Sequence, residues 1–382
     1  MITDTKAAIQ VVQDLVRIPS INPPGRESAV GEYIAEYCRA RRLPVETQTV
    51  SDGRFNVIAR LTGRREAPTL LISGHMDVVP VSESEWTRWE VDPFSGEIKD
   101  GFLWGRGSAD MKGGLGTALA VFGALAESGV EPPGDVLLVA TVDEEDLMRG
   151  VKTLVGHPAL DDVAFAIVCE PTEMQIKIAS KGRTWAEVTV EGRTAHASLK
   201  GAGINAIDKA WKLYASLKDH QLVHVPHPIL GESFWQVTMI RGGIEPAIVP
   251  DACVLTVDAR TVPGQTSEGV WQELQALLQQ LAEADPTFRA SVEVIERREP
   301  WETPRDHPFV AMMAEACRKS GHPVAYAGFF GTSDATVLRQ RGILGAAFGP
   351  GATADVHKEN EKVGLQDLER CVAIYEHILM RN

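Results

Sequence analysis

Seven acids and imidazoles of this 382-residue chain stand beside glycine, proline or the end of an apolar run, where side chains can converge. They are His75, Asp77, Asp110, Glu144, Glu145, Glu170 and His357. Imidazole nitrogens mixed with carboxylate oxygens are a ligand set that zinc and related divalent cations accept. Together these residues predict a hydrolase site that holds two metal ions.

The first pair follows an apolar run of strand length, residues 70–73, which ends at Gly74. In an extended chain residues i and i+2 point to the same side, so Asp77 can accept the ring N–H of His75. The other ring nitrogen then faces a metal. Taken alone, a histidine at a strand end has a second interpretation, that of a hydrogen-bonded structural residue.

Asp110 stands among four glycines, Gly105, Gly107, Gly113 and Gly114. Glycines let the backbone bend sharply and approach a ligand closely. A carboxylate held in such a segment could bridge two cations.

A third element is the β-rich run 136–142, which ends at the four consecutive acids 143–146. Neighbouring carboxylates repel one another, but divalent cations attract them and offset this repulsion. One carboxylate can then ligate a cation while another takes a proton from water. The alternative interpretation of such a run is a solvated loop or a helix N-terminus favoured by the dipole.

Two further elements complete the set. The apolar run 165–169 delivers Glu170 at its end, and His357 follows the loop 349–351 far along the chain. Ligands of α/β proteins gather at the carboxyl ends of strands. Five elements in order, at least three of them ending apolar strands, therefore favour the metal interpretation.

These motifs, taken over nearly the whole chain, resemble the M20 family of metallopeptidases and deacylases. The resemblance implies that His75 and Glu170 bind one zinc ion, that Glu145 and His357 bind the other, and that Asp110 bridges both. It also implies that Glu144 is the general base and that Asp77 orients His75. Cobalt and manganese use similar ligand sets, so the native metal stays open.

The same resemblance singles out residues in the middle of the chain. His196, in the segment 190–198, matches a lid-domain histidine that stabilises the oxyanion in the partner subunit's site, which implies a homodimer. Arg260 matches a lid arginine that holds a substrate carboxylate, and a planar guanidinium suits that task. The alternatives are a surface turn histidine and a strand-end surface arginine.

One turn resembles the family's substrate-contacting turn, and one position departs from the family. The turn consists of Gly331, Thr332 and Ser333, followed by an aspartate, and its alternative interpretation is a helix N-cap. Ala247 stands where many relatives carry an asparagine that contacts substrate. Alanine donates no side-chain hydrogen bond, so no particular relative's specificity is transferred.

The bulk properties exclude several classes of partner. The formal net charge of −14 argues against nucleic acid and anionic membranes. Five cysteines lack C-x-x-C spacing, which indicates reduced, buried thiols. The apolar-rich stretch 115–126 is too short to span a bilayer, and the N-terminal segment has no apolar signal core. We therefore expect a soluble cytoplasmic protein.

The organisation of the chain predicts two domains. Helical patterns at 5–17, 27–41 and 111–127 alternate with strands near 55–61, 69–74, 135–142 and 163–169, which predicts an α/β fold with a mixed sheet. Strands at 184–191, 234–241, 252–260 and 289–297 surround helical patterns at 203–219 and 266–284. We predict a discontinuous catalytic domain of zinc-peptidase type, 1–179 and 297–382, and an inserted α+β, ferredoxin-like lid and dimerisation domain, 180–296.

The predicted function is removal of an N-acyl group, acetyl or succinyl, from an amino acid or related amine by a metal-activated hydroxide with a glutamate base. The alternative is a dipeptidase or carboxypeptidase that uses the same site. A different class is a binding protein that keeps the fold without turnover, which the occupation of all six ligand and base positions argues against.

Overall fold

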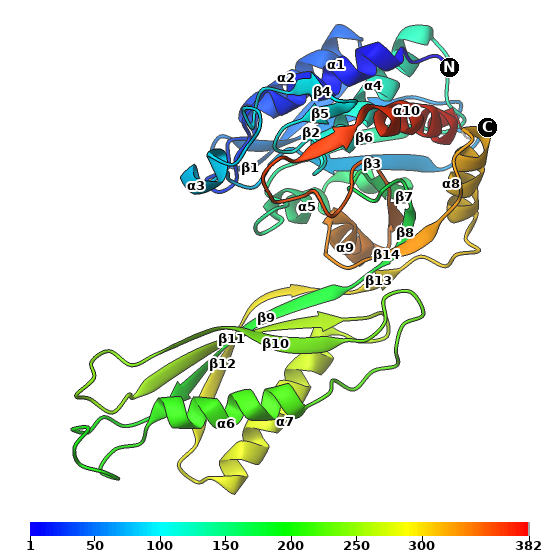
Figure 1. Cartoon of the computed structure of the whole chain (residues 1–382). Helices are drawn as coiled ribbons and strands as arrows, with labels where there is room; N and C mark the ends of the chain where they lie inside the picture. Colours follow the sequence, from blue (N-terminus) through cyan, green and yellow to red (C-terminus); the bar gives the residue numbers. More distant parts are fainter. Residues whose placement is uncertain (381–382) are drawn as a thin grey trace. The chain divides into compact units, whose positions relative to one another are not determined.

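The computed structural model describes residues 1–380, which divide into two compact units (Figure 1). Unit 1 consists of Met1–Ile178, Thr303–Phe329 and the chain from Ser333 onward. Unit 2 consists of Ala179–Glu302 and Phe330–Thr332. The predicted limits of the insertion, 180 and 296, both fall inside unit 2.

Unit 1 is built on a mixed sheet whose strands follow the order β1-β2-β6-β3-β7-β15-β8, with β14 paired to β8. The strands are β1 (Val45–Ser51), β2 (Arg54–Leu61), β3 (Thr69–His75), β6 (Val136–Thr141), β7 (Val163–Val168), β8 (Ile176–Ser180), β14 (Tyr326–Phe329) and β15 (Leu344–Ala347). The four neighbours β6, β3, β7 and β15 run parallel. β3 and β6 are buried along their whole length, as expected for parallel strands covered on both faces.

Helices pack around this sheet. They are α1 (Thr5–Val16), α2 (Ser28–Ala40), α3 (Glu83–Trp86), α4 (Lys112–Ser128), α5 (Arg149–Leu154), α8 (Pro308–Lys319), α9 (Asp334–Leu338) and α10 (Leu365–Met380), with short 3-10 turns at Pro158–Leu160 and Arg339–Arg341. α4 is buried over most of its length because it contacts β3 and β6 as well as α1 and α10. Gly114 lets α4 approach the segment after β7 as well, since a Cβ there would lie 2.2 Å from the carbonyl oxygen of Cys169.

A second, small sheet in unit 1 joins two distant parts of the chain. It has the order β16-β5-β4, from β4 (Glu97–Lys99), β5 (Phe102–Trp104) and β16 (Lys362–Gly364). The antiparallel pair β5 and β16 places residues 102–104 beside residues 362–364. The loops that carry Asp110 and His357 leave from these two strands.

Unit 2 is a four-stranded antiparallel sheet of order β10-β11-β9-β12 with two helices. Its elements are β9 (Gly182–Glu191), α6 (Ala206–Asp219), β10 (Phe234–Gly242), β11 (Ala252–Thr261), α7 (Ser267–Ala284) and β12 (Arg289–Arg298). The short β13 (Trp301–Glu302) pairs with Ser180 and Ala179 at the end of β8. The chain order, strand–helix–strand twice, is the ferredoxin-like arrangement. One apolar core lies between the sheet and the helices.

The predicted fold class is confirmed: a mixed α/β sheet carries an inserted α+β segment. The strands predicted at 55–61, 69–74 and 163–169 are present as β2, β3 and β7, and their ends shift by at most one residue. The sequence pattern did not predict β1 or the small sheet. β1 alternates partly buried and exposed positions without a long apolar run, and the strands of the small sheet have only three residues each.

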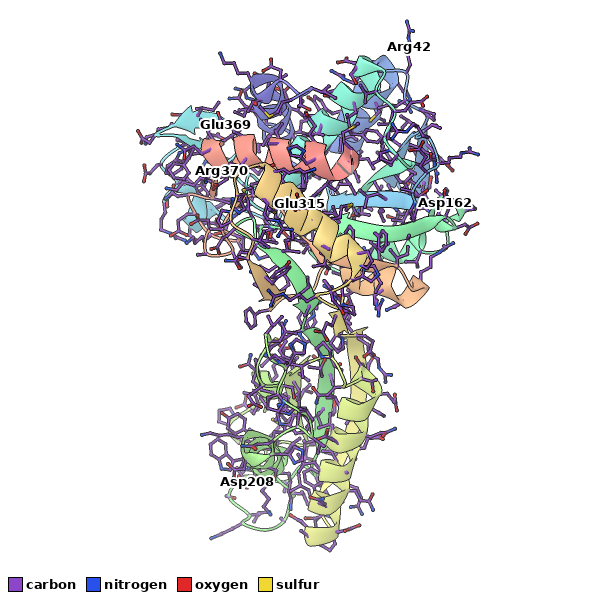
Figure 2. The ribbon with its side chains drawn as sticks, turned by 90° about the vertical axis from the view of Figure 1, so that its right-hand side faces the viewer. Arg42, Asp162, Asp208, Glu315, Glu369 and Arg370 are labelled. Carbon is purple, nitrogen blue, oxygen red and sulfur yellow. The ribbon has the colours of Figure 1, made fainter. Side chains whose placement is uncertain are left out.

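Many charged side chains are exposed on the outside of both units. Figure 2 shows Arg42, Asp162, Glu369 and Arg370 pointing away from unit 1 and Asp208 pointing away from unit 2. Within residues 1–380, every helix is too short or too polar to cross a bilayer.

Candidate metal centre

The carboxyl ends of the parallel strands deliver the candidate ligands to one edge of the sheet of unit 1. His75 is the last residue of β3, Glu145 lies beyond β6 and Glu170 lies beyond β7. β15, next to β7, leads into the loop that carries His357. Parallel neighbours end on the same side of a sheet, so residues far apart in sequence meet there.

His75 is buried, with 1% of its surface exposed. Its Nδ1 donates to the main-chain oxygen of Asp77 at 2.9 Å, while the nearer carboxylate oxygen of Asp77 lies at 3.6 Å. The ring hydrogen bond expected with the Asp77 carboxylate therefore goes to the carbonyl of the same residue. A bond from Nδ1 orients the ring and leaves Nε2 directed at Asp110, 3.2 Å away.

Asp110 lies between two imidazoles, two residues before α4. Its Oδ1 faces His75 Nε2 at 3.2 Å, and its Oδ2 faces His357 Nε2 at 3.3 Å. The two oxygens of one carboxylate are thus directed at two different groups of side chains. This is the arrangement that a carboxylate shared by two cations requires.

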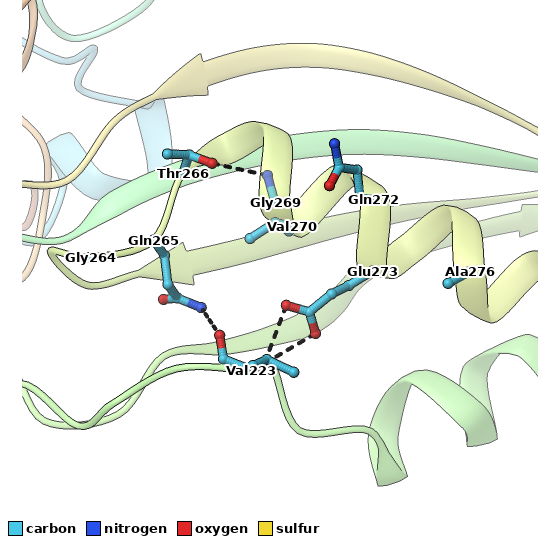
Figure 3. A pocket seen from close by; sticks show the side chains of 9 residues that line it. All are labelled: Val223, Gly264, Gln265, Thr266, Gly269, Val270, Gln272, Glu273 and Ala276. Atoms are coloured by element: carbon cyan, nitrogen blue, oxygen red, sulfur yellow. Dashed lines mark hydrogen bonds between the residues drawn. The ribbon is translucent and has the colours of Figure 1, made fainter.

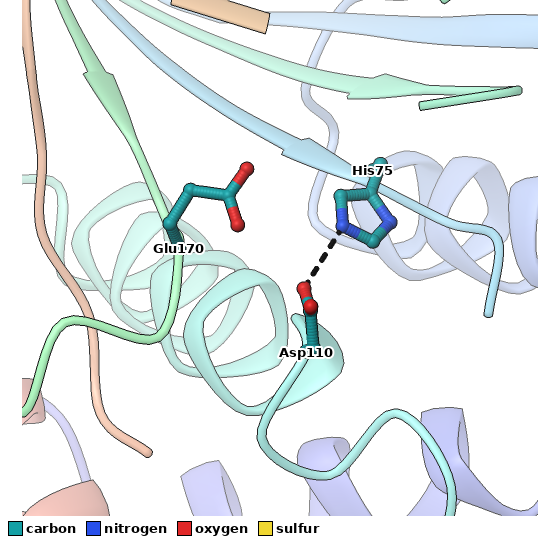
Figure 4. Close-up of side chains that lie close together, drawn as sticks. All are labelled: His75, Asp110 and Glu170. Atoms are coloured by element: carbon teal, nitrogen blue, oxygen red, sulfur yellow. Dashed lines mark hydrogen bonds and ion pairs between the residues drawn. The ribbon is translucent and has the colours of Figure 1, made fainter. Parts of the chain in front are cut away.

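Two overlapping sets of side chains could each hold an ion. In the first, ligand atoms of His75, Asp110 and Glu170 lie within 4.8 Å of one another. Figure 4 shows these three side chains directed toward the same space. In the second, ligand atoms of Asp110, Glu145 and His357 do the same, and His357 Nε2 lies 3.0 Å from Glu145 Oε1. The structure therefore brings together all five residues that were predicted as ligands, and Asp110 is common to both sets.

Asp77 holds the loop that carries the two glutamates. Its carboxylate accepts the main-chain N–H groups of Glu144 and Glu145 at 3.2 and 3.1 Å. Asn22 donates to the same carboxylate at 2.9 Å and to Asp143 at 3.2 Å. Asn22 was not predicted, because a single asparagine before two prolines has the same sequence pattern as an ordinary turn.

A buried arginine also supports this loop. Arg54 pairs with Glu27 and, at 2.8 Å, with Asp143. The side chains of Glu27 and Asp143 are fully buried. One guanidinium therefore compensates two buried carboxylates, of which Asp143 is the first residue of the acidic run. Arg54 is far from this run in sequence, so no local pattern pointed to it.

The electrostatics of the site favour bound cations. Burial, together with the negative charge of Asp110, raises the pKa of Glu145 and raises that of Glu170 well above its usual range. Burial opposes ionisation of Asp110 too, but hydrogen bonds from His357 and His75 hold its pKa low. The bonds to Asp110 and Glu145 raise the pKa of His357 to about 11. Crowded carboxylates thus draw protons onto the imidazoles, and divalent cations would neutralise the same carboxylates. The residues present fit such ions in donor type and in number.

Two of the predicted site residues, His196 and Arg260, belong to unit 2. His196 is exposed, and its Nδ1 accepts the main-chain N–H of Ser198 at 3.2 Å and lies 2.8 Å from the Ser198 hydroxyl. An accepting Nδ1 puts the proton of the neutral ring on Nε2. His196 can therefore donate a hydrogen bond through Nε2.

Arg260 lies at the end of β11, with 23% of its side chain exposed. It pairs with Asp258 at 3.0 Å and lies opposite Arg183 of β9. Burial lowers the pKa of Arg183, and the positive charges of Arg298 and Arg260 contribute to the shift. Such a cationic neighbourhood can receive an anion.

The turn 331–333 is divided between the units. In unit 2, Arg298 donates to Thr332 Oγ1 at 2.9 Å, and the Gly331 carbonyl accepts from Ser180 at 2.9 Å. In unit 1, Ser333 stands at the N-cap position of α9, but its side chain makes no capping hydrogen bond. Ser333 therefore has the position of a helix cap but not the hydrogen bond of one.

Ala247 lies in a loop of unit 2, where its carbonyl accepts the N–H of Ala197 at 2.9 Å. A hollow elsewhere in unit 2 lies between α7 and the segment at Val223 (Figure 3). The main chain of Val223 accepts a hydrogen bond from the Gln265 side chain and donates one to the Glu273 carboxylate at its border. None of the predicted site residues lines this hollow. The residues that could hold a metal ion lie at the strand ends of unit 1.

Comparison with known proteins gives consistent matches. The sequence model of peptidase family M20/M25/M40 matches residues 71–381. The chain is 33% identical to acetylornithine deacetylase of Myxococcus xanthus over 311 residues, 80% of this chain and 78% of that protein. It is 28% identical to succinyl-diaminopimelate desuccinylase of Methylobacterium radiotolerans over 393 residues, 98% of this chain and 96% of the relative. A dinuclear metal-binding M20 peptidase from Bacillus subtilis shares the fold with a TM-score of 0.76 at 16% identity, over 98% of this chain and 97% of that one.

Proposed function

Since this chain belongs to peptidase family M20/M25/M40, whose members named above hydrolyse amide bonds, we propose that it removes an N-acyl group from an amino acid or a related amine. The acyl group is of the acetyl or succinyl type, as in the names of these two relatives. The observation that carries the proposal is the pair of ligand sets that share Asp110.

The cofactors are two divalent cations, zinc in the first instance. His75, Asp110 and Glu170 would hold one, and Asp110, Glu145 and His357 the other. When bound, the cations would polarise the scissile carbonyl and lower the pKa of water. The dinuclear peptidase that shares this fold supports two ions, while similar ligand sets for cobalt and manganese leave the metal's identity to measurement.

Glu144 is the general base and acid. It takes a proton from the attacking water and returns it to the leaving amine. Glu144 is 7% exposed, and Asp77 accepts its main-chain N–H, so the backbone that carries the carboxylate is held in place. Asp77 positions this loop as well as His75 and takes no part in proton transfer.

His196 and Arg260 of unit 2 act on the substrate. His196 donates from Nε2 to the carbonyl oxygen as negative charge develops there, in the site of the partner subunit. Arg260 receives the carboxylate of the amino-acid part, and the turn Gly331, Thr332 and Ser333 contacts substrate. The tautomer of His196 and the cationic surroundings of Arg260 support these roles.

A homodimer formed through unit 2 completes the proposal. β10 is an end strand of its sheet, and among the described residues one of its sides pairs with no strand. Met239 and Ile240 on β10, Ile244 beyond it and Ile207 on α6 are 40–84% exposed. We call these four residues the edge surface. An unpaired strand edge with exposed apolar side chains is a surface that a second strand can cover.

The proposed compartment is the cytoplasm. All five cysteines are buried free thiols. Free thiols are typical of reducing compartments, which supports this location. The proposed partners are small acylated amino acids and a second copy of the chain, with no role for nucleic acid or membranes.

A substrate panel tests the proposal. The metal-reconstituted enzyme is assayed with N-acetyl and N-succinyl amino acids and with dipeptides, and we expect kcat/KM for a deacylation to exceed that for every dipeptide. Glu144→Gln protein from a parallel preparation controls for contaminating hydrolases. Hydrolysis of dipeptides without deacylation would overturn the proposal in favour of a peptidase with the same metals.

A further inference from the structure

We propose that Arg106 and Glu361 are a positioning pair that fixes Asp110 relative to His357 and thereby sets the affinity of the ion held by Asp110, Glu145 and His357. The inference rests on the proposed two-metal function. It concerns two residues that touch neither the ions nor the substrate and act through the loops that carry the ligands.

Glu361 holds the loop of Asp110 from behind. Its Oε1 accepts the main-chain N–H groups of both Ala109 and Asp110, at 3.0 and 3.1 Å. Its main-chain oxygen accepts the N–H of Gly105 at 2.9 Å. Glu361 is 1% exposed, so water does not compete for these bonds. Two successive N–H groups on one carboxylate oxygen fix the peptide from which the Asp110 side chain projects.

Arg106 ties the same carboxylate to the loop of His357. One of its terminal nitrogens donates to Glu361 Oε2 at 2.9 Å and to the carbonyl oxygen of Lys358, the residue after His357, at 3.0 Å. The other terminal nitrogen pairs with Glu85, and the guanidinium lies 5.4 Å from the centroid of the Trp89 ring. Arg106 is 1% exposed. Its planar fork allows these contacts at the same time, which a single ammonium could not reproduce.

The loop of His357 needs such support. His357 and Asn360 have positive φ angles of 59° and 63°. These angles lie in the left-handed region, which residues other than glycine rarely adopt. A backbone in this conformation persists when surrounding contacts hold it. The bond from Arg106 to Lys358 is one such contact, directly beside the ligand.

The two ligand sets depend on the pair unequally. In the first set, His75 ends β3 and Glu170 follows β7, so the sheet itself holds two of the three residues. In the second set, Asp110 and His357 lie on the two loops that Arg106 and Glu361 join. The pair therefore supports two of the three residues of the second set and one of the first.

The test measures binding of the metal alone. Zn²⁺ affinities of the two sites are determined at equilibrium by competition with a chelator, for wild type and for Glu361→Gln. The glutamine keeps the size and an acceptor oxygen but removes the charge that pairs with Arg106. We expect the dissociation constant of the second ion to rise about 10–100-fold, and that of the first to rise less. His357→Ala, which removes a ligand of the second set only, identifies the binding step that belongs to it.

Asp135→Asn is the matched control. Asp135 is also buried, accepts the main-chain N–H of Gly63 and pairs with Arg60, each at 2.9 Å. It precedes β6, at the end of the strand opposite to Glu144 and Glu145. Loss of this pair is expected to leave both zinc affinities unchanged.

Arg106→Lys provides a second variant, which keeps the positive charge but replaces the planar guanidinium with a single ammonium group. It too is expected to weaken the second ion more than the first, and it decides the question if Glu361→Gln does not fold. Thermal unfolding of the metal-free proteins is measured alongside. Variants that unfold at lower temperature yet bind both ions like wild type would reduce the pair to a structural role and overturn this inference alone. Failure of the wild type to bind two ions would overturn the proposed function as well.

Discussion

The strand ends of unit 1 and the edge strand of unit 2 differ in the groups that they bury and expose. Unit 1 buries its charged side chains at the strand ends, where His75 and Glu170 are 1% and 4% exposed. Unit 2 has exposed polar residues such as His196, and it also exposes apolar side chains along β10. Buried charges of one sign need counter-ions, and exposed apolar edges need a covering surface. The strand ends of unit 1 therefore suit bound cations, and the β10 edge of unit 2 suits a covering surface.

Metal removal tests the first half of this comparison and has the largest expected effect. Chelation should abolish activity and lower the stability of unit 1, because the cations bind the folded ligand sets only. At a free-ion concentration of 100 times the dissociation constant, one site contributes about 2.7 kcal/mol. Calorimetry with and without Zn²⁺ measures the shift. Identical traces would contradict a metal centre in unit 1.

Glu144→Gln separates proton transfer from metal binding within unit 1. We expect kcat to fall about 10²–10⁴-fold while the zinc content stays unchanged, because the proton shuttle is lost and the ligands remain. Steady-state kinetics and metal analysis of the same sample measure both quantities. Asp146→Asn, in the same acidic run, is the control and should keep activity. Unaltered turnover in Glu144→Gln would refute the role of the base.

His196→Ala asks whether unit 2 contributes to the chemistry at all. Loss of one donor to the developing oxyanion should reduce kcat about 10²–10³-fold. Lys200→Ala, in the same exposed loop, should leave kcat unchanged. An unchanged rate in His196→Ala would remove this residue from the mechanism.

Mixing the two inactive variants tests whether His196 acts across subunits. A dimer of one Glu144→Gln and one His196→Ala subunit retains one intact site if His196 serves its partner. With random pairing, activity should then recover to about a quarter of wild type. No recovery from a mixture proven to exchange subunits would place any action of His196 within its own chain.

Ile240→Lys tests the edge surface and acts on the chemistry only indirectly, through the fraction of chains that form a dimer. Ile240 is 54% exposed on β10, and a lysine there discourages pairing with another strand. We expect the dimer fraction to fall in sedimentation measurements. Ile98→Lys changes a 46% exposed isoleucine of unit 1 and should leave the dimer fraction unchanged. A wild-type monomer at all concentrations would contradict the proposed assembly.

Local pattern predicted much of unit 1. The apolar runs that form β3, β6 and β7 were recognisable because the length and the period of a strand depend on neighbouring residues. Each of these runs ends close to a residue of the candidate site. The amphipathic pattern at 5–17 became α1, Thr5–Val16. The small sheet was missed because three-residue strands carry no detectable period.

The residue types and their order along the chain determined the kind of chemistry, the strand ends that carry it and the insertion that separates them. Tertiary structure alone decided which distant groups hold the ligands in place. The Asp110 N–H and the Glu361 carboxylate that accepts it are 251 residues apart, and the Arg106 side chain meets the Lys358 carbonyl across 252. No periodicity encodes such contacts, because they depend on how β5 and β16 pair and on which loops that pairing brings together.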